Sequence, residues 1–171
     1  ARGLDPAEAV VVTGTAMGLF YSLANGLGRI VWGTVSDRIG RRTSIAVMSL
    51  LQGVVMIGFY FVGGTEWGLY AAAALIGFNF GGNFALFPAA TADLFGDANV
   101  GVNYPWVFLA YGVGGVAGPL LGGVTGDAGT WLLAFLPAGL ACLAAAALAL
   151  TLRPPRRRER PVLRESTAAP A

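Results

Sequence analysis

The sequence predicts an all-α membrane protein, a bundle of about five transmembrane helices. Of its 171 residues, 56% are hydrophobic and only 12% are charged, whereas about 25% of the residues of a soluble domain are charged. Five apolar runs are long enough to cross a hydrocarbon core, which needs about 20 residues. They lie at residues 9–34, 43–63, 67–92, 102–125 and 129–152. Their continuity favours helices, because barrel strands alternate polar and apolar residues.

Three of the runs carry small residues at every fourth position, a spacing that lets a neighbouring helix backbone approach closely. In the first run these are Gly14, Gly18, Ser22 and Gly26. In the third they are Gly77, Gly81, Ala85 and Ala89, and in the fourth Gly114, Gly118 and Gly122. We expect packing ridges at these positions, which suit static packing and sliding helices equally well.

The fifth run contains the single cysteine, Cys142, among alanines and leucines, where we expect it only to pack. The sequence has no histidine, so the usual general base and metal ligand are missing. We therefore expect no enzyme, no metal site and no cofactor.

Arginine sets the predicted orientation, because the sequence has no lysine and cytoplasmic loops carry the positive charge. Arginines follow the first run and, in greater number, the fifth. We place both on the cytoplasmic side of a multi-pass plasma-membrane protein. Tryptophans near the span ends fit the interfacial layer: Trp32, Trp67, Trp106 and Trp131.

Both ends of the chain lie outside the predicted bundle of residues 9–152. Residues 1–8 form an extracytoplasmic segment, and its Asp5 and Glu8 do not fit a signal peptide. Residues 153–171 are rich in proline and arginine and predict a disordered cytoplasmic tail. The tail fixes topology and suits anionic lipids; no other basic cluster suggests nucleic acid.

The connection after the first run reads GTVSDRIGRR. It resembles the GxxxDRxGRR loop of the major facilitator superfamily, which joins helices two and three and, in a second copy, helices eight and nine. Its signature positions are Gly33, Asp37, Arg38, Gly40, Arg41 and Arg42. We expect Asp37 to cap or face a helix N-terminus and Gly40 to make the turn. The resemblance implies a latch between transporter halves.

Four spans and a basic tail follow this loop, which matches helices eight to twelve of a twelve-helix transporter. We therefore expect a C-terminal fragment whose main partner is the missing N-terminal half. Residues 25–42, 81–96 and 101–115 are also similar to the oxalate/formate antiporter family. That resemblance implies a carrier of small organic anions, with Arg29 at the place of an arginine that binds the substrate carboxylate.

One departure from that family bears on the substrate. Oxalate carriers of the family use a lysine on the eleventh helix, and Tyr111 stands about where that lysine is expected. With one cation in place of two, a monocarboxylate such as formate, lactate or pyruvate fits the charge better than a dianion.

The residues themselves also single out Arg29. A charge near the bilayer centre costs about 2.5 to 3.5 kcal/mol on insertion scales, so it usually marks a water-filled pathway or a partner. Ser22, Asn25 and Arg29 share one helical face, and arginine offers a planar fork of donors to a carboxylate. The alternative is that Arg29 snorkels to the cytoplasmic headgroups.

Two further rows of side chains are weaker candidates for lining the same water-filled pathway. Asn79 and Asn83 lie four residues apart in the third run, although paired asparagines can also bond a neighbouring helix. Tyr104, Phe108 and Tyr111 follow one face of the fourth run. Tyr111 is the deeper tyrosine and the better candidate, whereas Tyr104 suits an interfacial anchor.

The coupling mechanism stays open in the sequence. All nine acidic residues fall in loops, tails or span ends, so no buried carboxylate is available as a proton relay. Anion exchange needs none, and proton symport would use another part of the protein or the substrate itself. A carrier of a sugar, drug or other metabolite, or a non-transporting sensor or scaffold, remains an alternative function.

Overall fold

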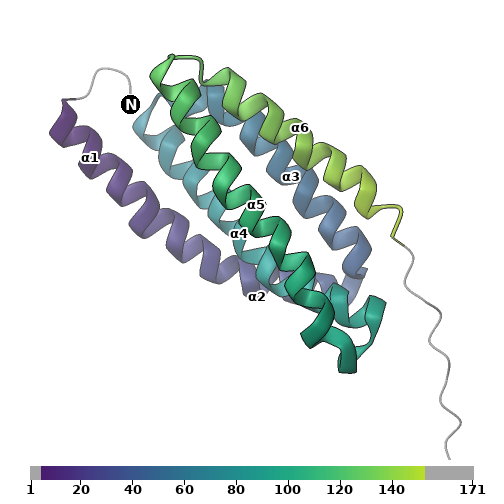
Figure 1. The fold of residues 1–171 in the computed structure, drawn as a ribbon. Helices are drawn as coiled ribbons and strands as arrows, with labels where there is room; N and C mark the ends of the chain where they lie inside the picture. Colours follow the sequence, from purple (N-terminus) through teal and green to yellow (C-terminus); the bar gives the residue numbers. More distant parts are fainter. Residues whose placement is uncertain (1–4, 153–171) are drawn as a thin grey trace, which may run out of the picture.

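The computed structural model describes residues 5–152, and these form a bundle of long helices (Figure 1). In chain order they are α1 Pro6–Thr15, the π-helical η1 Ala16–Tyr21, α2 Ser22–Ile39, α3 Arg41–Val62, α4 Glu66–Phe95, the 3-10 helix η2 Asp97–Asn99, α5 Val100–Asp127 and α6 Leu132–Ala149. Helices α1, η1 and α2 join into one span of 34 residues. Five spans in the described residues are long and apolar enough to cross a membrane, which confirms the predicted fold class.

The ends of the helices follow from local sequence. Asp5 accepts a hydrogen bond from the Ala7 N–H at 3.1 Å, and Pro6 opens α1. The predicted segment 1–8 is thus already helical from Pro6. Gly40 separates α2 from α3 with φ of 87°, a conformation that glycine adopts without strain. The predicted disordered tail, residues 153–171, lies outside the described residues.

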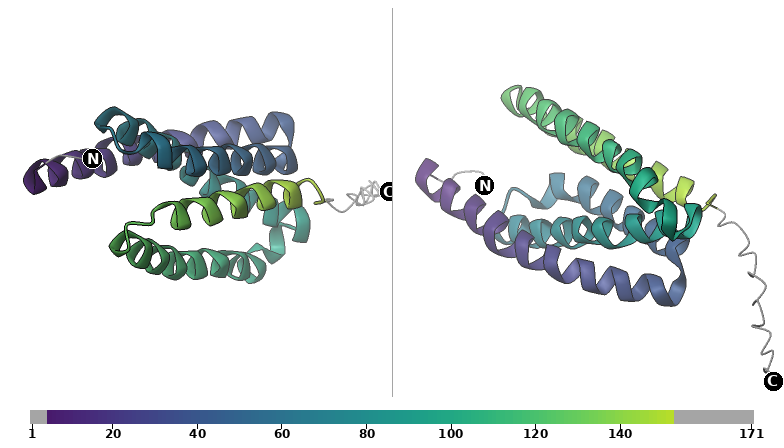
Figure 2. Two further views of the ribbon diagram at one scale, coloured as in Figure 1. Left: turned by 90° about the horizontal axis from the view of Figure 1, so that it is seen from above. Right: turned by 60° about the horizontal axis from the view of Figure 1, so that its bottom comes forward.

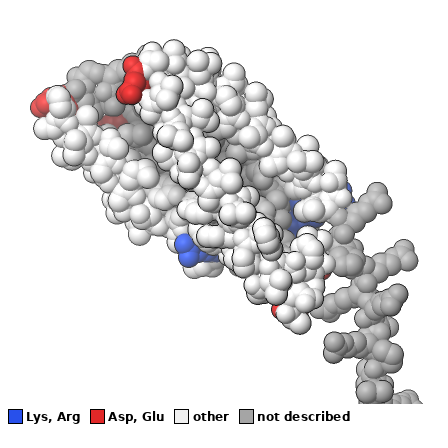
Figure 3. Space-filling view, in the orientation of Figure 1, with Lys and Arg blue, Asp and Glu red and all other residues white. Residues whose placement is uncertain are grey.

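Helix α4 is the centre of the bundle, because α2, α3 and α5 all pack against it. Helix α6 packs mainly on α3. Figure 2 shows α5 and α6 on the opposite side of the bundle from α1 and α2. Acidic side chains gather toward the ends, basic ones also lie part-way along the lower edge, and the surface over α5 is almost uncharged (Figure 3). This distribution fits helices that cross a membrane.

Close packing of α2 on α4 depends on three glycines. A β-carbon on Gly77 would collide with the backbone oxygen of Tyr21, and one on Gly81 with that of Asn25. From the other side, Gly28 meets the Phe78 carbonyl. The ridge predicted in the third run is therefore confirmed at its two glycines.

The other two predicted ridges have no such contacts in the described residues. A β-carbon on Gly14, Gly18 or Gly26 would meet nothing within 4 Å, and the same holds for the glycines predicted on α5. The expectation that these series pack closely is therefore wrong for this part of the chain. The physical reason on α2 is helical phase: Gly28 lies about 200° around the helix from Gly26 at 3.6 residues per turn.

Candidate functional site

Arg29 lies well inside α2, which continues ten residues beyond it to Ile39. At a rise of about 1.5 Å per residue, that distance is about 15 Å. The first apolar run ends at residue 34, and α2 continues five residues beyond it. Arg29 therefore lies inside the span, as its place in that run predicts.

Two contacts hold the Arg29 side chain. Its Nε donates a hydrogen bond to Asn25 Oδ1 at 3.3 Å, and its guanidinium carbon lies 4.8 Å from the ring centroid of Phe84 on α4. A cation over an aromatic face is attracted by the ring quadrupole. Within residues 5–152, no carboxylate oxygen forms an ion pair with Arg29. The positive charge is oriented but not neutralised by this part of the chain.

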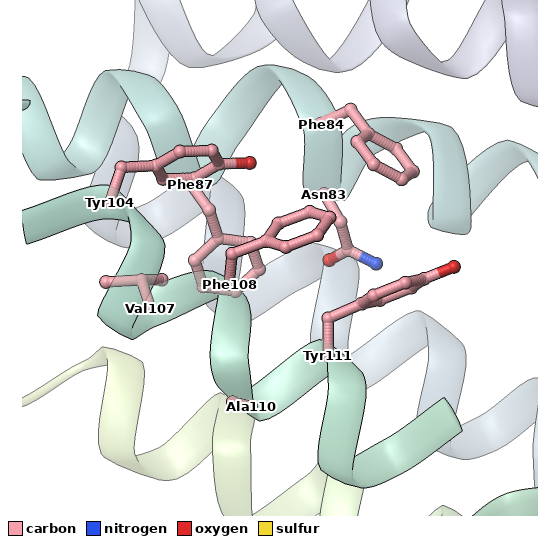
Figure 4. Close-up of a pocket in the computed structure, with 8 residues that line it drawn as sticks. All are labelled: Asn83, Phe84, Phe87, Tyr104, Val107, Phe108, Ala110 and Tyr111. Carbon is pink, nitrogen blue, oxygen red and sulfur yellow. The ribbon is translucent and has the colours of Figure 1, made fainter. Parts of the chain in front are cut away.

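Beside Phe84, a cavity of about 270 Å³ lies between α4 and α5. Helix α4 provides Asn83, Phe84 and Phe87, and α5 provides Tyr104, Val107, Phe108, Ala110 and Tyr111 (Figure 4). The rings are close together: the Phe84 centroid lies 6.1 Å from that of Tyr111 and 6.5 Å from that of Phe108. In Figure 4 the Asn83 amide points toward the rings of Phe108 and Tyr111. The pocket is therefore an apolar box with few polar groups.

Four of the six predicted binding residues fall in one neighbourhood. Asn25 touches Arg29 directly, and Asn83 and Tyr111 line the pocket that adjoins Phe84. Phe84 links the two parts because it contacts both Arg29 and Tyr111.

The other two predicted residues lie in different surroundings. The Ser22 hydroxyl donates to the Met17 carbonyl at 3.0 Å, within the π-helical part of the span. Asn79 is only 4% exposed and does not line the pocket. Its Oδ1 has no hydrogen-bond partner among the described residues. Although Asn79 and Asn83 are one turn apart, only Asn83 reaches the pocket.

The phenylalanines of α4 were not predicted as site residues. Phe80, Phe84 and Phe87 recur at helical spacing beside Asn83, and this periodicity was the available signal. In an apolar span it does not stand out, because lipid-facing positions are also rich in phenylalanine.

The signature positions are almost entirely helical, so the predicted loop is wrong in extent. Gly33, Asp37 and Arg38 belong to α2, Arg41 and Arg42 begin α3, and Gly40 alone makes the turn.

Asp37 also differs from expectation, because it lies in the last turn of α2 and forms an ion pair instead of capping a helix. Its Oδ1 is 2.7 Å from Arg41 Nη1, and Arg41 Nε lies 3.4 Å from Asp93 Oδ2 at the end of α4. Arg41 also donates to the Ser36 hydroxyl. This network ties together the ends of α2, α3 and α4. In the described residues, Arg38 and Arg42 form no ion pair.

Comparison with known proteins supports the assignment of this chain to a family of transporters. The sequence model of the Major Facilitator Superfamily matches residues 3–171. The oxalate:formate antiporter of Oxalobacter formigenes is 33% identical over 94% of this chain and 38% of its own length. An uncharacterized MFS-type transporter of Escherichia coli strain K12 is 35% identical over 56% of this chain and 24% of its own length. Apicoplast pyruvate carrier 1 of Toxoplasma gondii is 34% identical over 59% of this chain and 19% of its own length.

The chain thus spans less than two fifths of the length of each of these relatives. The family match nevertheless covers almost every residue, including the signature positions around Gly40 and the helices that carry Arg29 and the aromatic pocket. The five spans and their packing around α4 agree with that match. This chain belongs to the Major Facilitator Superfamily of membrane transporters.

Proposed function

We propose that this chain is part of a secondary transporter that moves small monocarboxylates by alternating access, with Arg29 binding the carboxylate. The observation that carries the proposal is the position of Arg29. It lies deep in α2, is oriented by Asn25 and Phe84, and has no carboxylate partner in the described part of the chain. An arginine inside a membrane span without a counter-ion usually serves a pathway or a ligand.

Arginine suits this role because its guanidinium stays charged and presents parallel donors that match a carboxylate. The Asn25 bond uses Nε, which leaves the terminal nitrogens for a ligand. A site with one cation and apolar surroundings favours a substrate that carries a single negative charge. The names of two relatives, an oxalate:formate antiporter and a pyruvate carrier, agree with a carboxylate substrate.

The acidic residues bear on coupling. Each described Asp and Glu lies in the first or last turn of a helix or outside the helices. Within residues 5–152, no carboxylate is therefore placed to relay a proton through the membrane. This arrangement supports anion exchange, and proton symport would need a group elsewhere in the transporter.

We further propose a plasma-membrane location with the Gly40 end in the cytoplasm. The arginines of the signature positions support this orientation through the positive-inside rule. The other transporter half and membrane lipids are the proposed partners. An alternating-access site lies between two such halves, near the midplane.

The test is uptake of labelled formate, lactate, pyruvate and oxalate into vesicles that contain the complete transporter. Arg29→Gln and Arg29→Lys are measured beside the wild type at equal expression. We expect uptake of a monocarboxylate by the wild type, loss with Arg29→Gln and partial retention with Arg29→Lys. Normal uptake by folded Arg29→Gln would show that Arg29 is not the carboxylate site, and no uptake of any acid by the wild type would refute the substrate class.

A further inference from the structure

Building on the proposed function, we infer that the pocket between α4 and α5 receives the apolar body of the substrate. The preferred substrate is then a monocarboxylate with a branched or aromatic body, and formate and oxalate are poor substrates. The carboxylate lies on Arg29, and the rest of the molecule crosses the Phe84 ring into the pocket.

The first argument is size. The cavity measures about 270 Å³, and a water molecule in the liquid takes up about 30 Å³. The pocket therefore has room for a group much larger than one water molecule. Formate or oxalate would leave most of that space to water held against apolar walls, which is unfavourable.

The second argument is the chemistry of the walls. Five of the eight lining residues are aromatic: Phe84, Phe87, Tyr104, Phe108 and Tyr111. Phe108 and Tyr111 are 43% and 49% exposed, so their faces are available in this part of the chain. Among the residues that the structure describes, no charged side chain lines the pocket. Such walls gain from covering an apolar or aromatic group and offer no ion pair to a second carboxylate.

The third argument is the distance between the charged and apolar parts. One face of Phe84 lies 4.8 Å from the Arg29 guanidinium carbon, and its ring centroid is 6.1 Å from that of Tyr111. A single ring therefore separates the cation from the pocket. A molecule with a carboxylate at one end and a compact apolar group at the other spans both.

The experiment is competition for labelled pyruvate uptake by the complete transporter in vesicles. The competitors form a series: formate, unlabelled pyruvate, 4-methyl-2-oxopentanoate, phenylpyruvate and oxalate. We expect 4-methyl-2-oxopentanoate and phenylpyruvate to compete about tenfold better than pyruvate, since one or two added apolar groups are worth that much in a fitted pocket. Formate and oxalate should compete less well than pyruvate.

Ala110→Phe tests where the apolar body binds, because residue 110 lines the pocket and a phenyl ring there adds bulk at its wall. We expect this variant to lower the affinity for phenylpyruvate about tenfold more than the affinity for pyruvate. Val116→Phe is the matched control, since Val116 is on the same helix, is exposed and lies outside the pocket. Val116→Phe should leave the order and strength of competition by the acids unchanged.

The outcomes separate the two proposals. If pyruvate is taken up but all acids compete equally well whatever their size, the pocket inference is overturned and the proposed function stands. An equal effect of Ala110→Phe on pyruvate and phenylpyruvate would also overturn it. Absence of uptake or competition by any acid would refute both. If Ala110→Phe fails to fold, the competition series of the wild type still decides.

Discussion

In the proposed site, Arg29 is already oriented without a ligand, because its Nε donates to Asn25 and its guanidinium lies over the Phe84 ring. Preorganisation of this kind reduces the entropy lost on binding. It also means that residues without charge contribute to an ionic site. Phe84 has the larger role, since it also forms a wall of the aromatic pocket.

Phe84→Leu should therefore weaken carboxylate binding even though it removes no charge. Leucine keeps apolar bulk but loses the ring face, and a cation–π contact contributes about 0.5 to 2 kcal/mol. We expect pyruvate affinity to fall by about two- to thirtyfold, measured as the half-saturation concentration for uptake. Phe84→Trp is the control and should retain affinity; equal losses in both variants would mean that shape, not the cation–π contact, matters.

Tyr111→Lys should move selectivity toward dianions. The tyrosine ring packs near Phe84, so a lysine at this position would add a second positive charge to the Arg29 neighbourhood. Opposite charges at about 4 Å attract by about 4 kcal/mol at an effective dielectric constant of 20. We expect the ratio of oxalate to pyruvate uptake to rise at least tenfold, whereas Tyr111→Gln, which adds no charge, should leave it low.

At the scale of elements, the contact between α2 and α4 depends on glycine backbone with no room for a side chain. A β-carbon at residue 81 would overlap the Asn25 backbone, which belongs to the same turn that orients Arg29. The close packing of α2 on α4 and the position of Arg29 in the proposed site thus depend on the same pair of helices.

Gly81→Ala should lower both thermal stability and uptake. Overpacking costs about 1 to 3 kcal/mol, and separating α2 from α4 also moves Arg29 away from Phe84. Gly118→Ala on α5 is the matched control, because a β-carbon there meets nothing within 4 Å in the described residues. We expect the control to melt at or above the wild-type temperature in detergent. Equal losses in both variants would show that the ridge of α5 also packs closely in the complete transporter.

At the scale of the whole molecule, Arg41 connects the ends of three helices through Asp37 and Asp93. These side chains are partly in contact with solvent, with Arg41 27% and Asp93 55% exposed. An exposed ion pair contributes only about 0.2 to 1 kcal/mol. The network therefore guides how the helix ends meet more than it stabilises them.

A double-mutant cycle with Arg41→Gln and Asp93→Asn measures this contribution. We expect a coupling of at most about 1 kcal/mol in thermal unfolding, and a smaller one at 1 M salt because of screening. A coupling that is several times larger and insensitive to salt would contradict the exposed network and indicate burial by another part of the transporter.

The proposed orientation can be tested with the single cysteine removed as Cys142→Ala. A cysteine is then placed at Gly64, between α3 and α4, or at Ala98, between α4 and α5; both positions are exposed. We expect an impermeant maleimide to label Gly64→Cys in intact cells and Ala98→Cys only after permeabilisation. The reverse pattern would invert the topology.

The sequence by itself determined the five spans and the turn at Gly40, and it singled out Arg29, Asn83 and Tyr111 as candidates for the proposed site. These features depend on local composition, because about 20 apolar residues cross a membrane whatever their neighbours are. A lone arginine in such a run is conspicuous for the same reason.

Only the tertiary structure decided which faces meet. It placed Gly81 against α2 and separated the buried Asn79 from Asn83 in the pocket. Within residues 5–152, it left open space where β-carbons on Gly14 and Gly18 would lie. It also brought Phe84 to Arg29 and Asp93 to Arg41 across long stretches of sequence. In a membrane, lipid-facing and packed faces are equally apolar, so hydropathy cannot distinguish them, and the choice depends on how distant helices fit.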